Sequence, residues 1–357
     1  MPGRDTIRRT RAEDITLRAD DTRQVLTVEG LEVTFKRRQG EIKAVRGVDF
    51  SLTAGRTLVL LGESGCGKSV TARAILRLYG RSARLGGSVR LGETELTTLD
   101  DTTMSQLRGA TIGMVPQDPS GSLDPLRAVG AQIVEVLRRH DVEPDGPKAR
   151  VIAAGLLERV GIHDSQRVLR SFPFELSGGM RQRIAIAIAI ACRPRVLIAD
   201  EPTTALDVTV QAQVLKLFTE LQRDLNMALL LVTHDVGVTR FVGDEVAVMY
   251  AGRLVETGPV GQVLDRPGHP YTAGLLDAMP LPGIPRGALR AIPGRPPGSD
   301  EHVADDACAL APRCAFANAE CSHHRPPLIE VAPGQLAACD VVGGVVPRST
   351  PLEAAHA

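Results

Sequence analysis

The sequence lacks tryptophan and has few aromatic residues of any kind, with three Tyr and seven Phe among 357 residues. Proteins that bind single-stranded nucleic acid stack bases on aromatic side chains, so we expect no such stacking platform. The chain also has no net charge, because 42 basic residues balance 42 acidic ones. Neutrality gives no electrostatic basis for binding a phosphodiester polymer, and we therefore expect no nucleic-acid partner.

Long apolar segments are absent as well. The longest apolar stretch, residues 184–192, is far shorter than the roughly 20 residues that a transmembrane helix needs. Residues 1–21 are charged throughout and lack the apolar core of a signal peptide. We therefore expect a cytosolic protein, in which thiols stay reduced and disulfides are rare.

The composition is typical of a soluble globular protein, with 43% hydrophobic and 24% charged residues. A chain of this length is expected to hold about two domains of roughly 150 residues each. Residues 1–23 alternate charges without an apolar period, which predicts a disordered tail. Apolar residues at about every second position then predict strands over residues 26–42 and 44–52.

Short apolar runs and helical patterns alternate in the next part of the chain. Residues 57–62, 195–200 and 228–235 are typical of buried parallel strands, and residues 69–78 are predicted to form a helix. Strands that alternate with helices indicate an α/β domain around a largely parallel sheet.

Residues 184–191, IAIAIAIA, alternate like a strand but are predicted to form a buried helix. A Ser-Gly-Gly turn and a polar run come directly before them, and this suits a helix start whose free N–H groups face an anion. Pro194 then ends the segment.

The last part of the chain is rich in proline, since 15 of the 24 prolines lie at Pro259 or beyond. Proline fixes φ and removes a backbone donor. We therefore expect that this part does not continue a regular sheet or form long helices. The prediction is an irregular extension with one short helix near Tyr271–Met279.

A phosphate-binding loop follows the strand at residues 57–62 and precedes the helix at 69–78. Its sequence fits the pattern G-x-x-x-x-G-K-[ST] in full, at Gly62-Glu63-Ser64-Gly65-Cys66-Gly67-Lys68-Ser69. The glycines let successive backbone N–H groups surround a phosphate, and the helix start adds its positive end. Lys68 can reach the β- and γ-phosphates, and the Ser69 hydroxyl can bind Mg²⁺. Cys66 is interpreted as a small residue tolerated in the loop.

Two carboxylates end the strand at residues 195–200. A buried carboxylate at Asp200 is costly unless a cation or hydrogen bonds satisfy it, and Mg²⁺ held with Ser69 would do so. The next residue, Glu201, is placed to orient or deprotonate a water molecule. In isolation, Glu201 would be interpreted as a solvated carboxylate.

Further motifs carry a family resemblance. In chain order they are VPQDP at 115–119, LSGGMRQR at 176–183, LIADEPTTALD at 197–207 and THD at 233–235. With the phosphate loop, they make residues 25–258 similar to ATP-binding cassette (ABC) ATPases. The resemblance implies an α/β P-loop NTPase fold with a mostly parallel central sheet, an N-terminal antiparallel β subdomain and a helical signature subdomain. It also implies hydrolysis of ATP with Mg²⁺.

The resemblance assigns roles within the ATP site. It implies that Glu201 and His234 are the principal catalytic groups, and that Gln117 contacts Mg²⁺ and the attacking water. Phe35 lies where such proteins often place an aromatic ring against adenine. The other positions implied to bind ATP or Mg²⁺ are Gly62, Ser64, Gly65, Cys66, Gly67, Lys68, Ser69, Val70 and Asp200.

The signature motif is implied to act on a second subunit. Its residues would bind the γ-phosphate of ATP held by the opposite subunit, in a head-to-tail dimer, and they are Leu176, Ser177, Gly178, Gly179 and Met180. Asp207 matches the aspartate of a loop that communicates between the two ATP sites. A helix start that faces no anion of its own domain is consistent with that arrangement.

The tail narrows the resemblance. HPYTAGLLDAMP at 269–280 and the cysteine-containing segment at 308–328 are similar to the C-terminal extension of oligopeptide and dipeptide importer ATPases. Met180 resembles the D-type subunit of such systems. The resemblance implies an ATPase peripheral to the cytoplasmic face of the inner membrane. Its implied partners are a second homologous ATPase subunit, two integral-membrane permeases and an extracytoplasmic substrate-binding protein. The expected parts are a cassette at 24–258, an extension at 259–345 and a tail at 346–357.

Four cysteines gather in the extension with the spacing C-x5-C-x6-C-x17-C, at Cys308, Cys314, Cys321 and Cys339. Clustered cytosolic thiols favour a metal over disulfides, and zinc sites usually contain a close C-x2–4-C pair that is missing here. The resemblance implies a [4Fe–4S] cluster, with zinc or no metal as alternatives. His323 and His324 are interpreted as surface residues.

A second function class is a soluble ABC ATPase that acts in DNA repair or translation rather than transport. Such proteins usually carry two cassettes, a coiled-coil insertion or basic surfaces. This chain has one set of cassette motifs, no heptad run and no net positive charge. These features favour the importer.

Overall fold

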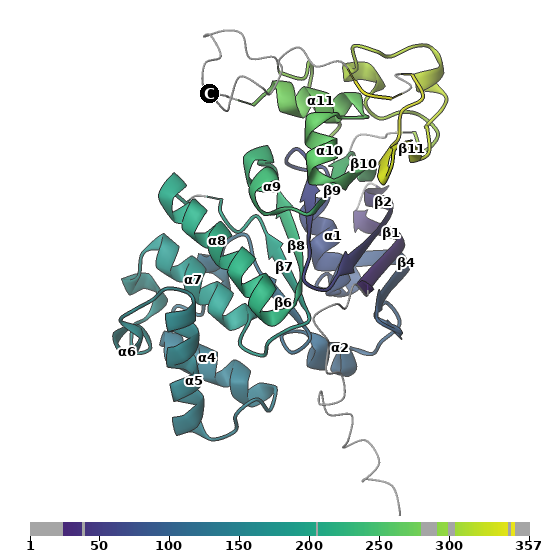
Figure 1. Cartoon of the computed structure of the whole chain (residues 1–357). Coiled ribbons are helices and arrows are strands. Elements are labelled where there is room, and N and C mark those ends of the chain that lie inside the picture. The colour runs from purple at the N-terminus through teal and green to yellow at the C-terminus, as the bar shows by residue number, and fades with distance from the viewer. Residues whose placement is uncertain are drawn as a thin grey trace, which may run out of the picture.

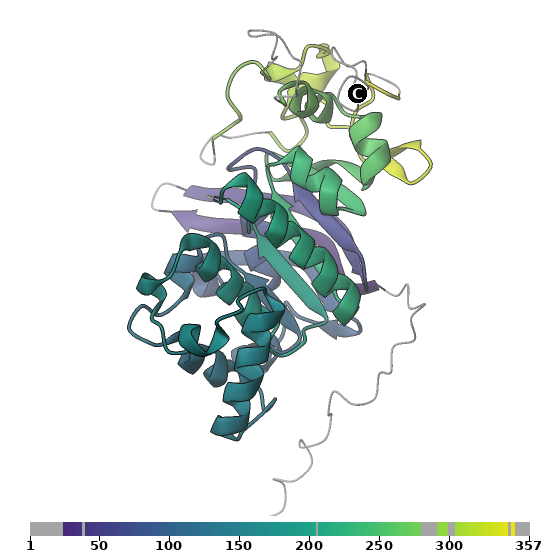
Figure 2. The same cartoon turned by 60° about the vertical axis from the view of Figure 1, so that its left-hand side comes forward.

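The computed structural model describes residues 24–37, 40–204, 206–279, 291–298, 304–341 and 344–346. The predicted tail at 1–23, and that at 346–357 beyond its first residue, lie outside them. A central sheet is covered by helices on one face and by a smaller antiparallel sheet with helix α1 on the other (Figures 1 and 2). Within the described residues, no helix is both long and apolar enough to span a membrane.

Among the residues that the structure describes, the central sheet contains eight strands in the order β11-β12-β10-β9-β3-β8-β7-β6. Five neighbouring strands run parallel, which confirms the predicted α/β architecture; they are β3 (Thr57–Leu61), β6 (Ile112–Val115), β7 (Val196–Asp200), β8 (Ala228–Thr233) and β9 (Glu245–Tyr250). Strands β3, β7 and β8 are buried along their whole length. Their continuous apolar runs follow from helices or sheet covering both faces.

Alternation along each parallel strand divides the core into two layers. In β3, Val59 and Leu61 face the helical layer, where they join Phe218 of helix α8 (Val208–Leu225). Leu58 and Leu60 face the other way and pack with α1 and the antiparallel sheet. A shift of one residue in strand register would exchange the two sets, so the pairing is strongly specified.

The antiparallel sheet has the order β2-β1-β4-β5, with strands at β1 (Gln24–Arg37), β2 (Gly40–Thr53), β4 (Ala83–Leu91) and β5 (Thr94–Glu95). The two N-terminal strands are confirmed, but the predicted boundary at residues 42–44 is wrong. Strand β2 begins at Gly40, whose φ of 126° is a conformation that favours glycine. Apolar alternation does not reveal where β1 ends and β2 begins, because it continues from one strand into the next.

Nine α-helices lie between β3 and β9: α1 (Lys68–Ile75), α2 (Asp101–Leu107), α3 (Pro119–Ser122), α4 (Val129–Arg139), α5 (Gly146–Arg159), α6 (Ser165–Val168), α7 (Gly178–Ala189), α8 and α9 (Val236–Val242), among the residues that the structure describes. The predicted helix at residues 184–191 is confirmed by α7. Its alternating Ile and Ala side chains are mostly buried, because α7 packs against α3, α4, α5 and β6. Burial on several sides hides the usual helical period in the sequence.

The prediction that the proline-rich extension adds nothing to a sheet is wrong. Strands β11 (Ile329–Ala332) and β12 (Gln335–Ala337) join β10 (Arg253–Pro259) at the edge of the central sheet. Prolines lie before β11 and in the turn after it, at Pro326, Pro327 and Pro333, and so do not interrupt the strands. Two helices, α10 (Val260–Asp265) and α11 (Pro270–Asp277), connect this region, and α11 confirms the one predicted.

The extension shares the hydrophobic core of the cassette rather than forming a separate one. Tyr271 and Leu276 of α11, together with Leu310, pack with the helical layer of the central sheet. His269 caps α11, because its Nδ1 accepts a hydrogen bond from the Tyr271 N–H at 3.1 Å. Burial lowers the pKa of His269 to about 4.

This buried histidine predicts a specific acid sensitivity. In the unfolded chain, His269 takes up a proton below about pH 6.5, but in the folded chain it stays neutral until about pH 4. Its contribution is therefore complete above pH 6.5 and is lost as the pH falls through this window, by up to about 3 kcal/mol. Urea unfolding midpoints at pH 7 and pH 4.5 measure the effect. His269→Asn keeps a neutral cap and should weaken the pH dependence; an unchanged dependence would contradict this assignment.

Candidate phosphate-binding site at the carboxyl edge of the sheet

The predicted phosphate loop connects β3 to α1 and passes very close to neighbouring backbone. A Cβ added at Gly62 would lie 2.3 Å from the Met249 carbonyl oxygen. At Gly67, where φ is 110°, it would lie 2.6 Å from the Ala44 carbonyl oxygen. Both positions therefore require glycine, and the surrounding strands hold the loop in its curled path.

Lys68 lies inside this loop and is 3% exposed. Its Nζ donates hydrogen bonds to the carbonyl oxygens of Gly62, at 2.8 Å, and Glu63, at 2.9 Å. These two hydrogen bonds hold the Lys68 ammonium over the concave side of the loop, at the start of α1. Lys68 and the positive end of the helix provide positive charge for an anionic ligand.

Asp200 ends β7 beside the start of α1 and is fully buried. Its Oδ1 accepts a hydrogen bond from the Ser69 hydroxyl at 2.6 Å, and Arg73 lies 3.3 Å from its Oδ2. Burial raises the pKa of Asp200, while the Ser69 hydrogen bond and the charge of Arg73 oppose the shift. A buried carboxylate joined to a hydroxyl is an oxygen donor set that fits Mg²⁺.

Glu201 brings together the other predicted catalytic residues. Its Oε2 accepts hydrogen bonds from Gln117 Nε2 at 3.0 Å and from the Thr204 hydroxyl at 3.1 Å. His234 Nδ1 lies 3.5 Å from its Oε1. Glu201 has a φ of 46°, and its N–H donates to the carbonyl of Val232 in the neighbouring strand. This left-handed conformation turns the chain at the strand end, and such strain is common at functional sites.

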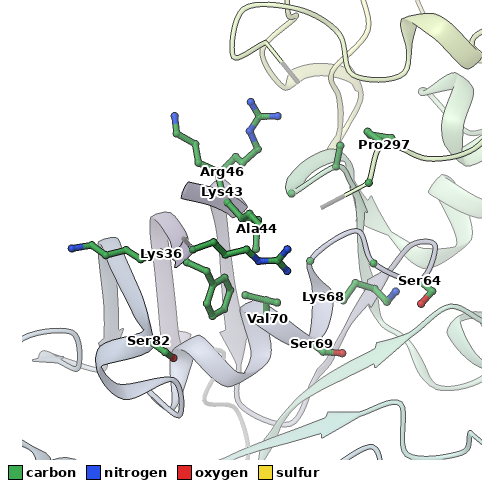
Figure 3. A pocket seen from close by; sticks show the side chains of 18 of the residues that line it. Lys36, Lys43, Ala44, Arg46, Ser64, Lys68, Ser69, Val70, Ser82 and Pro297 are labelled. Carbon is green, nitrogen blue, oxygen red and sulfur yellow. The ribbon is translucent and has the colours of Figure 1, made fainter. Parts of the chain in front are cut away.

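A cavity of about 590 Å³ opens over the phosphate loop, Gln117 and Glu201, whereas Asp200 and His234 lie outside its lining (Figure 3). Most of the predicted ATP-binding residues line it, namely Phe35, Ser64, Gly65, Gly67, Lys68, Ser69, Val70, Gln117 and Glu201. Phe35 makes an edge-to-face contact with Tyr79, with ring centres 5.0 Å apart. Cys66 points instead into the core, and burial raises the pKa of its thiol. This agrees with its interpretation as a small residue tolerated in the loop.

Sequence reasoning missed part of the cavity wall. Lys43, Ala44 and Arg46 line it from β2, and Ala251 and Gly252 line it after β9. These positions belong to no phosphate-binding pattern and reach the cavity only through sheet pairing. Two further lining residues, Pro297 and Gly298, come from the C-terminal extension. Pro297 lies above Lys68 and Ser64 in the view of Figure 3.

The signature residues lie away from this cavity. Ser177 and Gly178 are exposed at the start of α7, and the Ser177 hydroxyl caps the helix by accepting from the Met180 N–H at 3.3 Å. Asp207 similarly caps α8 by accepting from the Val210 N–H at 2.9 Å. Neither helix start lines the cavity in the described part of the chain.

The four tail cysteines line one small cavity of about 20 Å³. Within residues 304–341, where they lie, and throughout the rest of the described chain, no three His, Cys, Asp or Glu side chains are grouped as metal ligands. Burial raises the pKa of Cys308 and Cys314. The arrangement therefore gives no support to the predicted [4Fe–4S] cluster, which iron and sulfide analysis of anaerobically purified protein would measure directly.

Known proteins that resemble this chain bind ATP, as their names state. The family model for the ABC transporter matches residues 45–204, and the model for the oligopeptide/dipeptide transporter C-terminal region matches residues 255–321. The oligopeptide transport ATP-binding protein OppD of Bacillus subtilis is 43% identical over 94% of this chain and 93% of its own length. A Brucella abortus protein named for ATP binding in peptide import is 46% identical over 89% of this chain and 95% of its own.

Solved structures match the cassette. The ATP-binding cassette MJ0796, in a dimeric post-hydrolysis state with ADP and Pi, has a TM-score of 0.60 and 27% identity. The match covers 66% of this chain and 98% of the MJ0796 chain. CbiO1 from Clostridium perfringens, part of an ABC transporter complex, has a TM-score of 0.57 and 26% identity, covering 67% of this chain and 90% of its own. The chain therefore belongs to the ABC transporter family, as an ATP-binding protein of its oligopeptide/dipeptide-importing branch.

Proposed function

We propose that the cavity at the carboxyl edge binds Mg-ATP and that Glu201 is the base for its hydrolysis. The observation that carries this proposal is the contact of Glu201 with both Gln117 and His234, at the edge where Lys68 and Ser69 lie. ABC proteins of this family are ATPases coupled to peptide import. The residue roles within that activity are our assignment.

In this proposal, Lys68 and the loop N–H groups bind the β- and γ-phosphates. Ser69, Gln117 and Asp200 would hold Mg²⁺, which neutralises charge on the phosphate oxygens when it is bound. Phe35 would contact the adenine.

Hydrolysis needs one water molecule, positioned by Glu201, Gln117 and His234. Glu201 accepts a proton from that water. The water oxygen forms a bond to the γ-phosphorus, while the bond from the γ-phosphorus to the bridging oxygen breaks. ADP and inorganic phosphate are the products. His234 stabilises the charge on the γ-phosphate, and it is oriented by its contact with Glu201.

We further propose that the signature residues act on ATP held by a second subunit. Ser177 and Gly178 are exposed, and the helix start that they form lies outside the cavity of their own chain. An exposed helix start of this kind suits a phosphate brought by a partner. Leu176, Gly179 and Met180 would complete this surface. The related MJ0796 cassette is described as dimeric, which supports a head-to-tail arrangement.

The proposed complex is a peptide importer with a second homologous ATPase subunit, two membrane permeases and an extracytoplasmic binding protein. This chain would be peripheral to the cytoplasmic face of the membrane, and Asp207 would communicate between the two ATP sites. The proposed boundaries are a cassette at 24–258 and an extension at 259–345. The named relatives in peptide import support this function over DNA repair or translation.

Replacing Glu201 by Gln tests the catalytic assignment. The amide keeps the side-chain shape but cannot accept the water's proton, so we expect kcat to fall about 100-fold or more. Binding of Mg-ATP, measured by calorimetry, should be retained, because Glu201 is assigned to the chemical step. Glu220→Gln, on the exposed side of α8, is the matched control and should hydrolyse ATP normally. Undiminished hydrolysis by Glu201→Gln would refute the assignment.

Replacing Ser177 by Asp tests the partner-facing surface. Aspartate still caps α7, but its charge would repel the partner's γ-phosphate. In a Glu201→Gln background we expect Mg-ATP to bind the single chain normally and to fail to drive dimerisation, alone or with the second ATPase subunit. Light scattering after size-exclusion chromatography measures this. Ser177→Thr, a neutral cap, should still dimerise; ATP-driven dimers of the Asp variant at wild-type yield would exclude the proposed contact.

A further inference from the structure

One arginine of the C-terminal extension reaches the phosphate loop. Arg313 ends a short 3-10 turn at Ala311–Arg313 and is 7% exposed. Its two terminal nitrogens donate to the two carboxylate oxygens of Glu63, at 2.9 and 3.2 Å. This paired geometry is the strongest form of an arginine–carboxylate contact.

The same guanidinium is held in place on its other sides. Its Nη1 also donates to the Tyr250 hydroxyl at 3.3 Å, and its Nε donates to the Pro293 carbonyl oxygen at 2.9 Å. The guanidinium carbon lies 5.8 Å from the centre of the Tyr250 ring. Arg313 therefore joins the phosphate loop, the end of β9 and a second segment of the extension.

Glu63 is held by the extension through its backbone as well as its side chain. The Glu63 N–H donates to the Tyr271 hydroxyl of α11 at 2.8 Å. The carbonyl of this same residue accepts the hydrogen bond from Lys68 Nζ. The extension thus fixes a residue that in turn orients the phosphate-binding lysine.

Two other parts of the extension lie at the nucleotide cavity. Pro297 and Gly298 form part of its wall. Asp305 accepts hydrogen bonds from Lys43 at 2.8 Å and from Arg46 at 2.7 Å, and both of these cations also line the cavity. With Tyr271 and Arg313, the extension therefore contacts the surroundings of the ATP site at four places.

Burial decides which of these contacts dominates. Asp305 is 53% exposed, and ion pairs at such positions contribute little because water screens them. Arg46 and Arg313 are similarly buried, but the Glu63 side chain is only 26% exposed, so water screens its pair with Arg313 less. Removing Glu63 would leave the buried guanidinium of Arg313 without its partner charge. The contact between Arg313 and Glu63 is therefore the one whose loss would move the loop.

We propose that Arg313 is a positioning residue for ATP binding, which holds Glu63, and through it the phosphate loop and Lys68, in the conformation that receives the triphosphate. The inference rests on the proposed ATP site. Without Arg313, the Glu63 carboxylate would turn toward water and carry the loop with it. The C-terminal extension is then a part of the nucleotide site, and not only an addition to the cassette.

Calorimetric titration of the full chain with Mg-ATP tests this proposal. We expect Arg313→Ala to raise the Kd about tenfold, which corresponds to about 1.4 kcal/mol. Arg313→Lys keeps the charge but cannot make the paired hydrogen bonds of a guanidinium to a carboxylate. Its Kd should therefore lie between those of the Ala variant and the natural chain. In the assembled transporter, KM for ATP should rise while kcat at saturating ATP stays unchanged, because Arg313 touches neither the water site nor its base.

The double variant separates positioning from general stability. Glu63→Ala should raise the Kd to the same extent as Arg313→Ala, and the two changes together should add nothing further. Arg325→Ala removes the same charge from an exposed position of the extension and should leave the Kd unchanged. If Arg313→Ala does not fold, Glu63→Gln keeps the side-chain shape and should still raise the Kd.

Two results would overturn the proposal. One is a lower melting temperature for Arg313→Ala or Glu63→Gln with an unchanged Kd, which would make the contact purely structural. The other is additive losses in the double variant. Lys68→Ala tests the ATP site itself. If this variant binds Mg-ATP normally, the proposed function is wrong. If Lys68→Ala loses binding while Arg313→Ala binds Mg-ATP with an unchanged Kd, only the positioning role of Arg313 is wrong.

Discussion

The parallel pairing of β3, β8 and β7 is the constraint on which the rest of the site depends. Leu61 lies beside Thr233, and Asp200 lies beside Val232, so the three strands end at the same level. The phosphate loop, the two carboxylates and His234 each begin where a strand ends. Because register also assigns every side chain to one of two buried faces, a slip would disrupt the core and the site together.

The C-terminal extension is tied to this edge by packing and by charge. Tyr271 lies in the core beneath the phosphate loop, with its ring centre 4.6 Å from that of Tyr250, and its hydroxyl accepts the Glu63 N–H. Arg313 binds the Glu63 side chain from the next part of the extension. A segment that adds two strands to the sheet edge therefore also supports the loop at the sheet centre. If the proposed ATP site is correct, these contacts couple ATP binding to the folding of the extension.

Local patterns in the sequence predicted the parts of the fold that local chemistry determines. Buried parallel strands and helix α7 have short signals, and the structure confirms them. The phosphate-loop pattern also has a local signal, and the structure places that segment between β3 and α1 as expected. The strands of the extension were missed because proline content was weighed over the whole segment, while Pro326, Pro327 and Pro333 lie outside β11 and β12. The Arg313–Glu63 contact joins residues 250 positions apart and has no local pattern. Only the folded chain brings such residues together.

In the proposed mechanism, one chain provides every group of its ATP site except the signature, which serves a partner. Hydrogen–deuterium exchange of the Glu201→Gln chain, at a concentration where it is monomeric, tests this most directly. On adding Mg-ATP, we predict slower exchange at residues 62–70 and unchanged exchange at residues 176–180, with protection of 176–180 only in the dimer. Protection of 176–180 in the monomer, or none at 62–70, would contradict the account.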